Sequence, residues 1–132
     1  MKYTVLIARS LISLFGIALL VLGILFWTGH ALSLVPLHAM VLGGLFVVCL
    51  WVLALLGFLT PGNRGFAFLV LIWSLIVPAL GVEQLSLLPG AGHWLIQVIH
   101  LLVGIIAMGL GHALARRLGK RPAGTTAVAG TA

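Results

Sequence analysis

The sequence predicts an all-α membrane protein built as a bundle of four transmembrane helices. Hydrophobic residues make up 63% of the 132 residues and charged residues only 6%, and the mean hydropathy is +1.34. A soluble domain of this size could not bury so much apolar surface. The chain also divides into four apolar stretches, each long enough to cross a bilayer. We therefore expect the lipid bilayer to surround this protein.

The first two helices are predicted at residues 4–27 and 34–59. Glycine and proline mark the turns that follow them, in a Thr-Gly-His segment after the first and a Thr-Pro-Gly-Asn-Arg segment after the second. A basic residue before an apolar run is also typical of a signal peptide, but this run is longer than the apolar region of one. We therefore expect the first helix to be retained.

The third and fourth helices are predicted at residues 65–82 and 93–115, with a Leu-Pro-Gly-Ala-Gly segment before the fourth. The four helices are expected to form a single domain over residues 1–121. The last segment, residues 122–132, is rich in Ala, Gly and Thr and has no hydrophobic periodicity. Such a composition cannot bury enough apolar surface to fold. We therefore expect a disordered cytoplasmic tail.

Seven basic residues set the predicted orientation. They lie near the start of the first helix, in the second connection and after the fourth helix: Lys2, Arg9, Arg64, Arg116, Arg117, Lys120 and Arg121. The positive-inside rule places these regions in the cytoplasm, so both ends are predicted inside a multi-pass protein of the bacterial inner membrane. The net charge of +6 then reflects topology, and we expect no nucleic-acid partner.

Two histidines, His38 and His100, lie inside the apolar runs of the second and fourth helices. Ionisable side chains in a membrane are costly and indicate a functional site by default. The only acidic residue is Glu83, in the third connection, so an ion pair does not easily explain either imidazole. Counted along the two helices, the histidines lie roughly 6 and 10 Å below the outer ends. This similar depth predicts two ligands that face each other across the bundle.

Small and polar residues share helix faces with these histidines. One side of the fourth helix contains His93, Gln97, His100, Gly104, Ala107 and Gly111. A similar seam on the first helix contains Arg9, Ser13, Gly16, Leu20, Gly23, Trp27 and His30, and Gly43 and Gly44 follow His38 by little more than a turn. The glycines either clear space for a flat macrocycle or serve close helix packing. Both roles can hold at different heights.

The first interpretation of the histidine pair is a b-type haem held between His38 and His100. Haem iron has two axial positions, neutral imidazole commonly occupies them, and bundles build cofactor sites from facing helices. The chain contains no Cys-x-x-Cys-His segment, which excludes covalent c-type attachment. The propionates would point toward the outer surface. The further cofactor-binding residues expected are Gly104, Gln97, Gly43, Trp94, His93 and His30.

This pattern resembles small bacterial four-helix membrane b-type cytochromes of the cytochrome b561 kind. The resemblance rests on the four-helix architecture, on His38 and His100, and on Gly104 four residues after the second histidine. It implies that these histidines ligate haem b in an electron carrier or small membrane oxidoreductase, with a quinol or another redox partner. The family pattern generally supplies two ligand pairs. Here the inner half offers only His112, so a second haem would need a dimer or the His30–His93 pair.

Other interpretations remain open. His30, His38, His93 and His100 could bind a divalent metal, although zinc sites usually include a carboxylate or thiolate. Alternatively, the two buried histidines could hydrogen-bond to backbone or to each other in a structural or accessory subunit. A proton- or ion-coupled transporter fits the sequence poorly, because no acidic residue lies at mid-membrane. If the small seam of the first helix does not face a cofactor, it is the expected face of a homodimer.

Overall fold

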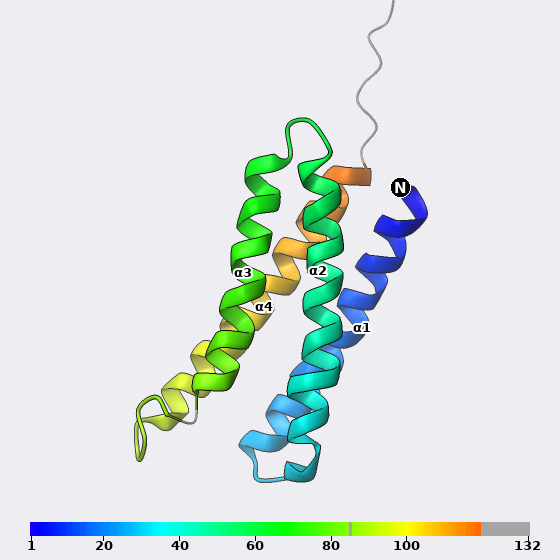
Figure 1. Ribbon diagram of the computed structural model, residues 1–132. Coiled ribbons are helices and arrows are strands. Elements are labelled where there is room, and N and C mark those ends of the chain that lie inside the picture. The colour runs from blue at the N-terminus through cyan, green and yellow to red at the C-terminus, as the bar shows by residue number, and fades with distance from the viewer. Residues whose placement is uncertain (85, 120–132) are drawn as a thin grey trace, which may run out of the picture.

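The structure of the protein, a computed structural model, describes residues 1–84 and 86–119. In chain order its elements are α1 (Lys2–Trp27), the 3₁₀ turn η1 (Leu32–Leu34), the π-helical turn η2 (Leu37–Leu42), α2 (Gly43–Phe58), α3 (Arg64–Glu83) and α4 (His93–Gly119) (Figure 1). Four segments are long and apolar enough to cross a membrane, with Leu32–Phe58 as one of them. These findings confirm the predicted all-α, four-helix, multi-pass class. The predicted tail, residues 122–132, lies outside the described residues.

The observed helices begin and end close to their predicted bounds. The second membrane segment, Leu32–Phe58, begins with η1 and η2 before α2 starts at Gly43, and α4 continues past residue 115 to Gly119. Arg116 and Arg117 lie in its last turn, where cations interact favourably with the partial negative charge of a helix C-terminus. Pro78 does not end α3, in keeping with the tolerance of transmembrane helices for proline.

The four helices pack as an up-and-down bundle. Helices that follow one another in the chain are neighbours, and α1 also packs against α4. The start of α1, the α2–α3 connection and the end of α4 lie at one end of the bundle (Figure 1). We call this the basic end, because Lys2, Arg64 and Arg116 belong to these segments. The α1–α2 and α3–α4 connections form the opposite, far end.

A tight turn joins α2 to α3 at the basic end. Gly62 has a φ of 80°, in the left-handed region that glycine adopts without steric cost. The backbone N–H of Asn63 donates to the carbonyl oxygen of Thr60 at 3.2 Å, and Arg64 Nε donates to the Phe58 carbonyl oxygen at 3.3 Å. These bonds satisfy backbone groups that the end of α2 leaves free.

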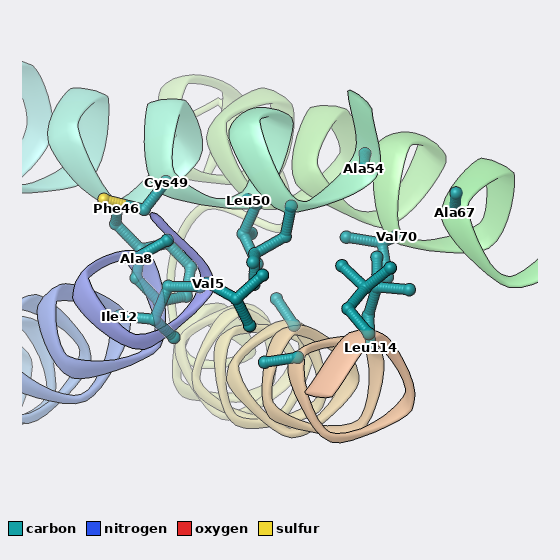
Figure 2. Packing of buried hydrophobic residues seen from close by; sticks show 14 residues of the cluster. Val5, Ala8, Ile12, Phe46, Cys49, Leu50, Ala54, Ala67, Val70 and Leu114 are labelled. Atoms are coloured by element: carbon teal, nitrogen blue, oxygen red, sulfur yellow. The ribbon is translucent and has the colours of Figure 1, made fainter. Parts of the chain in front are cut away.

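The buried core occupies the basic half of the bundle. It takes residues from the first part of α1 and α3 and from the last part of α2 and α4, including Ile12, Leu50, Val70 and Leu114 (Figure 2). In the far half, Ile96 is the one buried hydrophobic side chain among the residues that the structure describes. The α1–α2 and α3–α4 pairs diverge toward the far end (Figure 1). The helices are therefore held together mainly from the basic end.

Glycines bring the helix backbones together within this core. A Cβ atom at Gly111 would lie 2.7 Å from Leu50 Cδ2 and 3.1 Å from Ile12 Cδ1, and one at Gly57 would lie 2.8 Å from the Ala67 Cβ. All three separations are shorter than van der Waals contact. At this height the small residues therefore serve close packing.

We expect Gly111→Ala to destabilise the bundle by about 1–3 kcal/mol, the usual effect of overpacking a core. Gly109→Ala is the matched control, because a Cβ there meets nothing within 4 Å and alanine favours the helix. The check is the unfolding midpoint of each purified variant in detergent. Equal midpoints for the two variants would contradict this account of the core.

Candidate functional site

His38 lies in the π-helical turn at the start of the second membrane segment. Pro36 precedes the turn, and the N–H of Gly43 donates to the carbonyl oxygen of His38, five residues back. A Cβ at Gly43 would lie 3.1 Å from that same oxygen, so Gly43 adjoins the backbone of its own helix. Single π-turns occur frequently at functional sites. The wider turn changes the direction in which His38 points relative to the rest of α2.

The His38 ring packs against α1. Its centroid lies 5.3 Å from that of Phe26, with the two rings at 68° in an edge-to-face arrangement. Its Cε1 atom lies 4.0 Å from the position of a Cβ on Gly23. Edge-to-face contacts of this kind stabilise aromatic pairs by about 0.5–1.5 kcal/mol. Phe26 and Gly23 therefore hold the ring of His38 from the neighbouring helix.

The His100 ring packs in the same manner against α3. A Cβ at Gly81 would lie 3.1 Å from its Cε1 and 3.8 Å from its Nε2. Each histidine is thus on the second helix of a hairpin and meets a glycine on the first. Sequence reasoning selected Gly23 as part of a seam but missed Gly81. The signal was a glycine in the last turn of the third helix, which forms a hairpin with the helix of His100.

His38 and His100 both lie in the far half of the bundle, and both side chains are half-buried. The Nδ1 atoms of both rings are buried, and neither has a hydrogen-bond partner. An unpartnered buried polar atom costs about 1–3 kcal/mol. No other side-chain nitrogen or oxygen in the described residues is buried and unpartnered in this way. In the described residues, His38 and His100 are therefore the only side chains with buried polar atoms that lack a hydrogen-bond partner.

Four of the predicted cofactor-binding residues lie at the far end, near the connections, and we call them the rim residues: His30, His93, Trp94 and Gln97. His30 Nδ1 and the hydroxyl of Thr28 form a hydrogen bond of 3.1 Å, and His93 Nδ1 donates to the carbonyl oxygen of Leu87 at 3.4 Å. Trp94 is exposed and Gln97 is half-buried on α4. The two rim histidines therefore make local bonds within their own connections.

The geometry does not assemble the four-histidine metal site that the sequence allowed. Among residues 1–84 and 86–119, no three His, Cys, Asp or Glu side chains gather closely enough to hold a metal ion. His112 lies in the basic half, where its Nε2 and the hydroxyl of Ser13 form a hydrogen bond of 3.1 Å. The other four histidines belong to the far half. His112 consequently has no partner imidazole within this chain.

The seam on α1 faces the inside of the bundle. A Cβ at Gly16 would lie 2.6 Å from the sulfur of Met108, and Gly23 adjoins His38. Its glycines contact side chains of η2, α2 and α4 of the same chain, and the homodimer face expected only if the seam faces no cofactor stays a prediction. A Cβ at Gly104 would meet nothing within 4 Å, so there is open space beside α4 one turn from His100.

Comparison with known protein families, with curated proteins and with solved structures finds no match to this chain. Its side chains and their geometry are therefore the basis for inferring a function.

We expect Gly81→Ala to displace the His100 ring, because the added methyl would come within 3.1 Å of Cε1. Gly23→Ala is the matched control, since its methyl would meet His38 at an ordinary contact distance of 4.0 Å. NMR of protein labelled with ¹³C at the histidine Cε1 positions checks this. The His100 signal should move in Gly81→Ala by more than the His38 signal moves in Gly23→Ala. A larger change at His38 would refute the assigned packing.

Proposed function

We propose that this protein is a membrane b-type cytochrome in which His38 and His100 are the axial ligands of a single haem. The observation that carries the proposal is the pair of half-buried imidazoles, one on each hairpin, whose Nδ1 atoms are buried without hydrogen-bond partners. They lie in the far half, where the helix pairs diverge and buried core residues are almost lacking in the described chain (Figure 1).

The two imidazole side chains are suitable ligands for haem iron. Imidazole nitrogen is a common axial ligand, and a neutral imidazole offers the lone pair of one ring nitrogen to a metal. The surroundings are apolar, with the ring of Phe26 beside His38, and the only carboxylate side chain of the chain is at Glu83, the end of α3. An apolar pocket between facing helices is typical of cofactor sites in bundles.

A bound haem would supply a one-electron redox couple. His38 and His100 together would fill both axial positions, so the chain would leave no open position for oxygen or substrate and would favour electron transfer over activation chemistry. The open side of Gly104 would admit one edge of the macrocycle. We assign contacts with the propionates to the rim residues of the far end, His30, His93, Trp94 and Gln97.

The proposed partners follow from this location. A quinol in the bilayer or a redox protein at the far, outer side would exchange electrons with the site. The bacterial inner membrane is the proposed location, since the basic end then faces the cytoplasm. These features are those that the resemblance to cytochrome b561-type proteins implies.

A purely structural role for the two histidines has less support. Histidines that join transmembrane helices do so by hydrogen bonds, as His112 does with Ser13. Neither Nδ1 atom of the His38–His100 pair makes such a bond. The contrast between these histidines favours a ligand at the pair.

The test is the visible absorption spectrum of the purified protein, expressed with ample haem, before and after reduction with dithionite. We expect sharp reduced α and β bands that are lost in both His38→Ala and His100→Ala. His112→Ala is the control and should retain them, because its ring is engaged in the other half of the bundle.

A colourless wild-type protein under these conditions would refute the proposal. Bands that persist in either single variant would remove that histidine as an axial ligand. Metal analysis of the same samples reports whether iron is present in proportion to the protein and whether another divalent metal replaces it.

A further inference from the structure

A second feature lies at the basic end, away from the histidine pair. The start of α1 and the end of α4 border a cleft of about 430 Å³. Its charged lining consists of Lys2, Arg9 and Arg116, and its apolar lining includes Val5, Leu6 and Leu118. The cleft therefore combines cations from two helices with an aliphatic wall.

The positive charge of this cleft has no acidic counterpart nearby. The only Asp or Glu of the chain is Glu83, which ends α3 at the far end. Arg9 of α1 and Arg116 of α4 both line the cleft. Two guanidinium groups thus approach one region from two helices. An anion placed there would interact with both.

A hydrogen bond closes the cleft on its inner side. Ser13, one turn after Arg9, and His112, one turn before Arg116, are joined across α1 and α4 at 3.1 Å. The Ser13 hydroxyl also lies 3.3 Å from the Arg9 carbonyl oxygen and donates to it. This contact ties the two helices together just below the cations. The cleft consequently opens toward the basic end and the surrounding membrane, where Leu6 is 58% exposed.

We propose that this cleft binds the phosphate group of an anionic phospholipid, with an acyl chain along its aliphatic wall. Guanidinium groups bind phosphate oxygens through paired, charge-assisted hydrogen bonds. Basic pockets between transmembrane helices bind anionic lipid headgroups in the same way. The apolar wall selects a lipid over a free phosphate ion. This inference does not depend on the haem proposal.

The chain offers a matched control for the cleft arginines. Arg64 and Arg117 are also at the basic end, but Arg64 donates to the Phe58 carbonyl oxygen and the Arg117 guanidinium lies 4.3 Å from the centroid of the Phe66 ring. Neither residue lines the cleft. The double variants Arg9→Gln/Arg116→Gln and Arg64→Gln/Arg117→Gln remove the same charge from the same end.

The experiment is native mass spectrometry of the full chain in detergent, titrated with phosphatidylglycerol and, separately, with phosphatidylcholine. We expect the wild type to prefer phosphatidylglycerol. The cleft double variant should bind it about thirtyfold more weakly, or about fivefold for each charge removed. The control double variant should change by less than about threefold. Millimolar inorganic phosphate should not displace the lipid.

Three outcomes would overturn the inference. An equal loss in both double variants would indicate a general effect of charge at this end. Equal binding of phosphatidylcholine would indicate an apolar groove without headgroup recognition, and displacement by inorganic phosphate would indicate a site for the free ion. If the cleft double variant is not recovered folded, the single variants Arg9→Gln and Arg116→Gln decide the comparison against Arg64→Gln and Arg117→Gln.

Discussion

The constraint on which this structure depends is that a polar group inside a membrane must find its partner within the protein. The deep tryptophans meet it: Trp51 Nε1 donates to the Ser74 hydroxyl at 2.8 Å, and Trp73 Nε1 donates to the Val103 carbonyl oxygen at 2.9 Å. Each bond also joins two helices. Against this background, two unpartnered imidazole nitrogens are an exception, and such exceptions call for a functional explanation.

The buried core that stabilises the bundle and the candidate site lie in opposite halves of its length. In the basic half, Gly57 and Gly111 let the backbones approach, and the buried core fills the space between them. In the far half, Gly23 and Gly81 instead accommodate histidine rings. The same residue type therefore has two roles at two heights, because what lies opposite each glycine differs. A packed half can position the helices while the other half remains less tightly closed.

Basic and acidic side chains are also separated along the length of the bundle. The basic side chains of the described residues gather at one end, and the single carboxylate side chain is at the other. With no acidic partner for proton exchange, the histidine pair is better suited to ligand binding than to proton transport. The cations at the basic end are likewise unbalanced by carboxylates, which favours anions from outside the chain as their partners.

The sequence by itself determined the four membrane segments, their alternating direction and the similar depth of His38 and His100, because hydropathy, turn residues and charge placement are local properties. Only the tertiary structure decided that Gly81 meets His100, that a π-turn precedes Gly43 and that His112 pairs with Ser13. These contacts depend on the rotation of each helix about its axis. Helices that are apolar on all sides carry little information about that rotation, and the packing of their neighbours sets it instead.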